Sequence, residues 1–388
     1  MFSKVYLSIS KYILTKIVYQ SILKYIEDQF GKGHEDMANK ENPYTVGFGR
    51  IPAHYISRDA VIDEIIDNFK SVNVQGQAYK LTGIRGTGKT VTLTAIERKL
   101  NEDDRWIVIG VRPEGNILEE LVGSIYNEVP LLASFFKTDL NLNKFGIGVD
   151  IQNVNPVSNL ASALKKILEE LQKKDKRLLV TIDEVKNTPE MRAFVQEFQL
   201  LSRKDLPIHL IVAGLYDDIE DLENADHLTF FLRAEKYEMK PLNYTIIRSD
   251  YMKTLGVDRK VAEEMAAITK GYAFAYQALG KYMWESGEKE ITEDVLARLD
   301  EALAEKVYEK IWSELTPKER WFLGFIVKKE TMPVSELLEL TKQKKNEFSK
   351  PRHKLKRKGI IDTSVRGMLT IRLPRFREFV ENQLEEEE

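Results

Sequence analysis

One octapeptide constrains the fold of this 388-residue chain more than any other feature. It reads, in order, Gly83, Ile84, Arg85, Gly86, Thr87, Gly88, Lys89 and Thr90. Glycines let backbone N–H groups turn inward around phosphate oxygens, and the start of a helix adds its dipole and its free N–H donors. The lysine offers a positive charge and the threonine a hydroxyl for a metal ion. Because an apolar run precedes the octapeptide and a helical pattern follows it, the sequence predicts a phosphate-binding loop between a strand and a helix.

An acidic pair follows another apolar run further along the chain. Residues 178–182 precede Asp183 and Glu184. Since ligands bind at the carboxyl ends of parallel strands, Asp183 is expected near Thr90, where the two would hold Mg²⁺. Glu184 would then act as the general base that activates the attacking water. Taken alone, such a pair also fits the cap of the next helix, and it is the phosphate loop that favours the catalytic interpretation.

Short apolar runs alternate with helical patterns through the first part of the chain. The strand-like runs cover 77–84, 105–112, 178–183 and 207–213. Apolar residues at helical spacing predict helices over 89–103, 116–129, 158–176 and 188–204. This alternation predicts an α/β fold with a parallel sheet covered by helices on both faces. Residues 144–154 predict a small hairpin, and the pattern from 244 to 312 is helical throughout.

The composition excludes several classes of protein. The chain has no cysteine, which excludes disulfide scaffolds, thiolate zinc sites, iron–sulfur clusters and cysteine nucleophiles. Lys and Arg number 58 against 61 Asp and Glu, for a net charge of −3, so a basic surface for nucleic acid has to be local. The length predicts two or three domains. The lack of cysteine fits the reduced cytoplasm, which is the expected location.

The first stretch, residues 4–30, is apolar and rich in Tyr and Ile, but lysines interrupt it. Its longest uncharged run, 17–23, is too short to span a membrane, so no transmembrane segment is expected. Three interpretations stay open. The stretch is a basic amphipathic helix on a membrane surface or a partner, a helix packed on its own domain, or an extension that precedes a natural start at Met37. Whether residues 1–36 are a genuine part of the protein is left open as well.

The C-terminal part has a pattern of its own. Thr316, Pro317 and Glu319 are typical of a helix start, with an N-cap, a first-turn proline and a capping box. Further helices are expected over 333–340 and roughly 346–358, and Gly359 would end the last of these. Proline removes a helical hydrogen bond, so Pro351 fits this helix only if the helix starts near Ser349. Two strands at 360–362 and 368–373 would follow, and the acidic end at 385–388 is expected to fray.

Three helices followed by a β-wing resemble a winged helix-turn-helix. Residues 342–358 hold nine Lys or Arg residues against one acid, Glu347. Such local charge on a helix that would enter a major groove predicts phosphate contacts with duplex DNA. The residues expected to contact DNA are Lys350, Arg352, Lys354, Lys356, Arg357, Lys358 and, in the wing, Arg366. Winged helices also bind proteins, and a lysine-rich face can simply be solvated, so a protein partner stays open.

The octapeptide and the acidic pair resemble the Walker A and Walker B motifs of P-loop ATPases, and the Asp-Glu pair resembles the AAA+ and STAND branch. Residues 55–59 look like the box that precedes the P-loop in origin-recognition-type and STAND ATPases, where it lies against adenine. The resemblance implies ATP or ADP as ligand and Mg²⁺ as metal. It implies that the nucleotide is held by Ile56, Arg58, Gly83, Arg85, Gly86, Thr87, Gly88, Lys89, Thr90 and Val91.

Two segments extend this resemblance and also depart from it. Residues 207–215 stand where the family has its sensor-1 strand, but this strand ends in Ala213-Gly214, which cannot orient a water molecule. Residues 269–280 resemble the family's helical lid, yet the segment offers Lys270 and Gln277 in place of the usual Arg. A missing positive group lowers the rate of phosphoryl transfer by orders of magnitude, so slow, switch-like hydrolysis is expected. Arg233 is the catalytic candidate for the missing charge, in cis or toward a neighbouring subunit, with Arg85 as the other.

The expected architecture is a P-loop NTPase sheet, an all-helical lid and a winged helix-turn-helix. The expected segments are an N-terminal extension with its linker at 1–42, an AAA+-type ATP-binding domain at 43–240, a lid at 241–312, a winged-helix domain at 313–380 and an acidic tail at 381–388. The expected function is Mg-dependent ATP binding with slow hydrolysis, acting as a switch for DNA binding. The alternatives are a nucleotide-sensing regulator with negligible turnover and a STAND-type signalling or defence switch whose winged helix binds protein. Oligomers are common in this family.

Overall fold

A computed structural model describes residues 41–47, 52–71, 76–132, 135, 156–228 and 230–387. The expected helix within 4–30 and the expected hairpin at 144–154 lie outside these ranges. Packing divides the chain into two units, Met1–Pro43 and Tyr44–Glu388. Everything below concerns the second unit.

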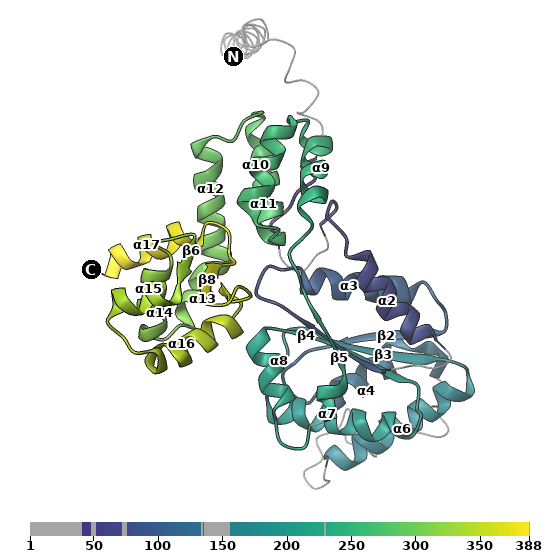
Figure 1. Cartoon of the computed structure of the whole chain (residues 1–388). Helices are drawn as coiled ribbons and strands as arrows, with labels where there is room; N and C mark the ends of the chain where they lie inside the picture. Colours follow the sequence, from purple (N-terminus) through teal and green to yellow (C-terminus); the bar gives the residue numbers. More distant parts are fainter. Residues whose placement is uncertain are drawn as a thin grey trace, which may run out of the picture. The chain divides into compact units, whose positions relative to one another are not determined.

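A five-stranded parallel sheet forms the first part of this unit (Figure 1). Its strands are β1 (Ala78–Thr82), β2 (Trp106–Val111), β3 (Arg177–Ile182), β4 (Ile208–Gly214) and β5 (Glu235–Glu238), in the spatial order β2-β3-β4-β1-β5. All neighbouring strands pair in parallel. The four strands predicted from apolar runs are confirmed. The edge strand β5 was not predicted, because its sequence Glu-Lys-Tyr-Glu is charged and largely exposed.

Helices cover both faces of this sheet, as predicted (Figure 1). One face packs against α2 (Asp59–Lys70) and α3 (Lys89–Asn101). The other packs against α4 (Ile117–Glu128), α6 (Pro156–Lys173), α7 (Pro189–Ser202) and α8 (Tyr216–Glu223). Short 3₁₀ turns lie at η1 (Pro130–Leu132) and η3 (Phe231–Arg233). The three inner strands β1, β3 and β4 are buried on both sides, which explains why their sequences are almost continuously apolar.

The chain after β5 is helical, as expected. It forms α9 (Tyr244–Leu255), α10 (Arg259–Thr269), α11 (Ala273–Ser286), α12 (Glu293–Leu303) and α13 (Glu309–Ser313). A π-helical turn, η4 (Ala304–Tyr308), joins α12 to α13. Helical spacing predicted a helix here but not this turn, which contains one residue more than an α-helical turn.

The C-terminal elements are α14 (Pro317–Ile326), β6 (Thr331–Pro333), α15 (Val334–Thr341), α16 (Lys345–Arg357), β7 (Ile361–Asp362), β8 (Met368–Ile371) and α17 (Phe376–Glu387). The three strands form an antiparallel sheet in the order β6-β8-β7. The three helices and two strands expected from the sequence are present in the expected order, and Gly359 ends α16 with a φ of 71°. The three-residue strand β6 and the helix α17 were not predicted.

Two details of this region correct the sequence-based expectations. Pro351 lies inside α16, not in the first turn of a helix that starts at Ser349. Its ring shares the buried face of α16 with Phe348 and Leu355, and this burial offsets the lost backbone hydrogen bond. The expected acidic tail is not frayed up to Glu387 but continues α17. Leu384 of this helix packs so closely on Gly324 that a Cβ there would lie 2.7 Å from its Cδ1.

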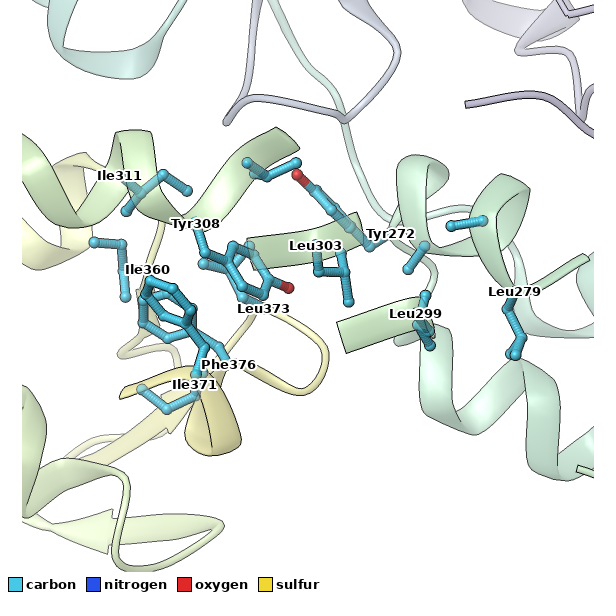
Figure 2. Close-up of a cluster of buried hydrophobic side chains, with 14 of the residues drawn as sticks. Tyr272, Leu279, Leu299, Leu303, Tyr308, Ile311, Ile360, Ile371, Leu373 and Phe376 are labelled. Atoms are coloured by element: carbon cyan, nitrogen blue, oxygen red, sulfur yellow. The ribbon is translucent and has the colours of Figure 1, made fainter. Parts of the chain in front are cut away.

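One hydrophobic cluster runs through the helices after β5 and the C-terminal elements. Figure 2 shows Leu299 and Leu303 of α12 in the same cluster as Tyr308, Leu373 and Phe376. The rings of Tyr308 and Phe376 meet edge to face with centroids 4.9 Å apart. Packing alone therefore sets no boundary between the expected lid at 241–312 and the expected winged-helix domain at 313–380, and this division stays a prediction.

The start of α14 yields a prediction about stability. The Thr316 hydroxyl accepts a hydrogen bond from the Glu319 backbone N–H, and the Glu319 carboxylate accepts one from the Thr316 N–H at 2.9 Å. We expect Thr316→Ala to lower the free energy of unfolding by about 1 kcal/mol, because the Glu319 backbone N–H loses the hydroxyl that caps it. Urea unfolding followed by circular dichroism would measure the loss. Thr316→Ser is the matched control, and equal midpoints for the alanine and serine variants would contradict the prediction.

Candidate nucleotide site

The octapeptide forms the turn between β1 and α3. Gly86 and Gly88 have φ angles of 74° and 89°, a region that favours glycine, and Gly88 is the residue that precedes α3. A Cβ at Gly86 would collide with the side chain of Tyr272. The loop therefore has its backbone N–H groups at the beginning of a helix, which is the arrangement that binds phosphate.

Lys89 turns back onto its own loop. Its ammonium donates to the carbonyl oxygens of Gly83 and Ile84, at 3.0 Å each. Burial lowers the pKa of Lys89 to about 8, and the nearby Asp183 opposes this shift. A phosphate at this place would replace weak carbonyl partners by charged oxygens.

Thr90 and Asp183 meet although they are 93 residues apart in the sequence, Thr90 in the first turn of α3 and Asp183 just after β3. The Thr90 hydroxyl donates to a carboxylate oxygen of Asp183 at 2.5 Å. The other oxygen of Asp183 accepts from the Glu184 N–H at 2.8 Å, and Glu184 has a φ of 54°. A hydroxyl and a carboxylate are hard oxygen ligands, so the pair fits Mg²⁺, which keeps several waters and phosphate oxygens as its other ligands. Among the described residues no group of three or more His, Asp or Glu side chains could hold a metal ion without such help.

A cavity of about 280 Å³ lies over the loop. It is lined by most of the residues expected to hold nucleotide: Ile56, Arg58, Arg85, Gly86, Thr87, Gly88, Lys89, Thr90 and Val91. Asp183 and Glu184 border it as well. Gly83 does not line the cavity, because it packs against Thr87 and Met239. The guanidinium of Arg58 donates to the Thr87 carbonyl at 3.2 Å, which joins the segment before α2 to the loop.

Residues 44–47 and 52–56 form one wall of this cavity, and side chains of α9 and α11 hold them. Gln277 contacts both stretches with its amide, accepting from the Thr45 N–H at 3.0 Å and donating to the His54 carbonyl at 2.8 Å. Asp250 accepts from Tyr44 and Tyr276 at 2.8 and 2.6 Å. The sequence had suggested Gln277 as a polar group for the phosphates. The structure shows that its amide positions this wall.

The sensor-1 position carries no side chain and is crowded by its neighbours. A Cβ on Gly214 would lie 3.0 Å from Val185 and 3.2 Å from Ile219. Lys186 and Asp218, the polar sequence neighbours of Val185 and Ile219, border the cavity, and neither was expected from the sequence. Burial raises the pKa of Asp218, and Lys186 opposes this shift. Asp218 follows the carboxyl end of β4, so the rule that ligands bind at strand ends would have found it.

Lys270 of the lid segment and Arg233, the candidate for the missing charge, both lie away from the phosphate loop. The Lys270 ammonium donates to the Ile371 carbonyl at 3.2 Å, toward the C-terminal sheet. Arg233 precedes β5, whose first residue pairs with Tyr79 at the amino end of β1. The phosphate loop follows the carboxyl end of β1, so Arg233 is at the opposite edge of the sheet, beside Phe198 and Arg203. The structure does not bring Arg233 to the loop of its own chain.

The basic residues of α16 divide into two groups. The side chains of Lys350, Lys354 and Lys356 are exposed and Arg352 is half-exposed, and Arg366 is exposed in the turn between β7 and β8. Arg357 and Lys358 instead contact α8. The Arg357 guanidinium lies 3.1 Å from Asp217, 2.8 Å from Glu220 and 2.9 Å from Asp221, and Lys358 lies 3.5 Å from Asp217. We call this group of contacts the α8–α16 clasp.

The clasp is close to the phosphate loop. A Cβ on Gly359, the residue that ends α16, would collide with the side chain of Ile84 and approach the ring of Tyr216 to 2.9 Å. Tyr216 donates to Glu238 at 2.7 Å, and Arg372 of the C-terminal part lies 3.4 Å from the same carboxylate. The end of α16 therefore packs directly on the second residue of the octapeptide.

Comparison with known proteins agrees with this geometry. Residues 72–222 match the family model described as AAA domain, and residues 305–380 match one described as a domain of unknown function, DUF8462. Among solved structures, the ORC2 protein of Aeropyrum pernix in ADPNP–ADP complexes aligns with a TM-score of 0.53 at 15% identity, covering 88% of this chain and 97% of that one. This is the AAA+ P-loop fold. Similarity to AAA+ ATPases is consistent with an ATP hydrolase.

Two further archaeal structures align over similar lengths. Cdc6p of Pyrobaculum aerophilum covers 88% of this chain and 97% of its own at 16% identity and a TM-score of 0.44. The ORC1 protein of Aeropyrum pernix in complex with DNA covers 88% and 95% at 15% identity and a TM-score of 0.41. No curated protein sequence matches the chain significantly. Within the described part of the chain, no helix is long and apolar enough to cross a membrane.

The lowered pKa of Lys89 yields a prediction about pH. Only the protonated amine attracts phosphate, so above pH 8 the Lys89 amine has to take up a proton from solution when ATP binds. We expect ATP affinity to fall by up to about tenfold per unit between pH 8 and 9.5, with proton uptake on binding. Calorimetry in two buffers of different ionisation enthalpy would measure both. Lys89→Arg, which stays charged, should remove the slope, and a wild-type affinity that is constant over this range would contradict the prediction.

Proposed function

We propose that this chain binds Mg·ATP in the cavity over the phosphate loop, hydrolyses it slowly, and uses the nucleotide state to control a DNA-binding surface on α16. The observation that carries the first part is the convergence of Lys89, Thr90, Asp183 and Glu184 on one cavity at the carboxyl edge of a parallel sheet. These are the groups that phosphoryl transfer needs for charge, metal and water.

Each residue has an assigned task in this proposal. The loop N–H groups and Lys89 hold the phosphates, and Thr90 with Asp183 would hold Mg²⁺, which neutralises charge on the phosphate oxygens when bound. Glu184 borders the cavity and is exposed, so its carboxylate is free to take a proton from water. Asp250 and Gln277 hold the wall formed by residues 44–47 and 52–56, which would face the base.

Slow turnover follows from what surrounds the phosphates. The sensor-1 position, Gly214, offers no side chain and is crowded by Val185 and Ile219, and the polar groups of the lid motif, Lys270 and Gln277, are engaged elsewhere. Each missing group that would stabilise the transition state costs roughly 10²–10³ in rate. Arg233 remains proposed as a charge donated to a neighbouring subunit, because the opposite edge of the sheet is accessible to one.

The α8–α16 clasp supports the coupling between nucleotide and DNA. Asp218 borders the cavity, and its neighbour Asp217 holds Arg357 and Lys358. A ligand in the cavity that moves the first turn of α8 therefore also moves Asp217 and changes its contacts with Arg357 and Lys358. Arg357 and Lys358 belong to the basic face proposed for duplex DNA, so the clasp and DNA phosphates compete for them.

Two alternative functions each have an observation in their favour. A nucleotide-sensing regulator with negligible turnover is favoured by the lack of a side chain at Gly214. A signalling switch in which the C-terminal part binds protein is favoured by the clasp itself, since α16 already binds acidic side chains of a protein helix. The experiments below separate these functions from the proposed one.

The proposed chemistry predicts different results for two variants. We expect Glu184→Gln to lower ATP turnover at least about a hundredfold while ATP binding is retained, because the general base is lost and the phosphate loop is intact. Lys89→Ala should lose both turnover and binding. Single-turnover hydrolysis of labelled ATP and calorimetric titration would measure the two properties. Glu190→Gln, an exposed acid in the first turn of α7, is the matched control.

Each result has a clear meaning. Unchanged turnover in purified Glu184→Gln would exclude Glu184 as the base. Wild-type turnover that is indistinguishable from buffer, combined with tight ATP binding, would favour the sensing regulator.

Opening the clasp is expected to strengthen DNA binding. Asp217→Asn combined with Asp221→Asn removes the acid that holds Lys358 and two of the three acids that hold Arg357, so affinity for generic duplex DNA should rise. The slope of log affinity against log salt should steepen by about 0.9 for each freed cation. Fluorescence anisotropy with a labelled duplex over a range of salt would measure this.

Asp226→Asn, an exposed position just after α8, is the matched control for the clasp. Weaker or unchanged DNA binding in the double variant would argue against competition. No measurable DNA binding in wild type or double variant, at low salt, would favour the protein-binding alternative.

A further inference from the structure

The proposed ATP site lacks a cation from the lid motif. Lys270 donates to the Ile371 carbonyl, and both ends of the Gln277 amide are bonded to backbone groups of Thr45 and His54. Transferring a phosphoryl group nevertheless calls for positive charge beyond that of the loop lysine. A second cation that borders the same cavity would meet this need.

Lys306 is such a cation. It lines the cavity together with Val307, from the π-helical turn η4, far in sequence from the segments that resemble nucleotide-binding motifs. Ala273 and Phe274, at the start of α11, line the same cavity, and so do Arg85 and Gly86 of the phosphate loop. The Phe274 N–H donates to the Gly86 carbonyl at 3.0 Å. Lys306 therefore shares its cavity with the phosphate loop.

The π-helical turn explains why a lysine stands at this place. Along α12 the buried residues are Val295, Leu299, Ala302 and Leu303, and an α-helix continued in this register would bury residue 306. The extra residue of the π-turn shifts the buried stripe by one position, so that Val307, Tyr308, Ile311 and Trp312 continue it. Lys306 is thereby released from the core, and its side chain is 39% exposed.

The turn is fixed on both sides of Lys306. Figure 2 shows Leu303 and Tyr308 in the hydrophobic cluster with Tyr272. Tyr308 is fully buried and donates to the Pro374 carbonyl at 2.5 Å. Further along, Glu314 lies 3.8 Å from the guanidinium of Arg85 in the phosphate loop. Lys306 itself forms an ion pair with Glu305, its exposed sequence neighbour, and such a pair contributes little and exchanges easily.

We propose that Lys306 contacts the terminal phosphate of ATP and supplies the positive charge that the lid motif does not. The inference rests on the proposed function, because it concerns the same nucleotide site. ADP lacks the terminal phosphate, so Lys306 distinguishes ATP from ADP. It also counters the negative charge on that phosphate during transfer.

The test compares the affinities for ATP and ADP in one titration series with Mg²⁺. Lys306→Ala is expected to weaken ATP binding by about tenfold or more, since a charged hydrogen bond to phosphate is lost, while ADP affinity changes less than about twofold. Single-turnover hydrolysis should slow at the same time. Lys306→Arg keeps a cation and should restore the preference for ATP. Lys310→Ala, which removes a lysine one turn further on that does not line the cavity, is the matched control.

The outcomes separate this inference from the proposed function. If wild type binds ATP and Lys306→Ala keeps the same ratio of ATP to ADP affinity, the role of Lys306 is overturned and the nucleotide site stands. If wild type binds neither nucleotide at millimolar concentration, the proposed function itself fails, and the role of Lys306 fails with it. If the alanine variant does not fold, Lys306→Met preserves the aliphatic stem, and its ATP-to-ADP ratio decides the question.

Discussion

The contact between the Thr90 hydroxyl and the Asp183 carboxylate is the interaction on which the rest of the site depends. Thr90 follows β1 and Asp183 follows β3, and the sheet places β4 between these strands. The two side chains meet only because all three strands are parallel and end at one edge, so that a phosphate loop and an acidic pair from distant parts of the sequence share a cavity. Any shift in the register of β4 would separate them.

Electrostatics then joins this edge to the C-terminal part. Helix α8 starts where β4 ends, directs Asp218 toward the cavity and directs Asp217, Glu220 and Asp221 toward Arg357. The same helix thus faces two kinds of cation, those around the phosphates and those at the end of α16. An acidic helix in this position holds a basic face much as a nucleic-acid backbone would, which is why regulation by competition is the proposal.

Sequence reasoning succeeded where local chemistry decides structure. The octapeptide, the acidic pair, four apolar strands and the capping box at Thr316 each have a local physical cause, and the structure places them as predicted. It failed where long-range packing decides. The strand β5 has a charged sequence, and its strand conformation comes from its pairing with β1. Gln277 binds backbone groups of residues that lie far from it in the sequence. Pro351 is tolerated inside α16 because its ring is buried.

The positions of two cations, Arg233 and Lys306, were likewise decided by long-range packing and not by local sequence. Arg233 was a reasonable guess from its place after the sensor-1 strand, but the parallel pairing of β5 with β1 puts it at the other edge of the sheet. Lys306 could not be found from sequence, since helical spacing would have buried it, and only the π-turn releases it. The roles assigned to individual site residues are therefore proposals that rest on geometry.

The single hydrophobic cluster from α9 to α17 has a mechanical consequence. Helices and strands that share one core are expected to move together, so α9 to α17 would rotate as a unit about the short connection between β5 and α9. A rotation of a few degrees there would displace the exposed lysines of α16 much further than the residues next to the connection. Leaving α8 then requires breaking the α8–α16 clasp and the packing of Gly359 on Ile84 and Tyr216, and it requires no unfolding of this region.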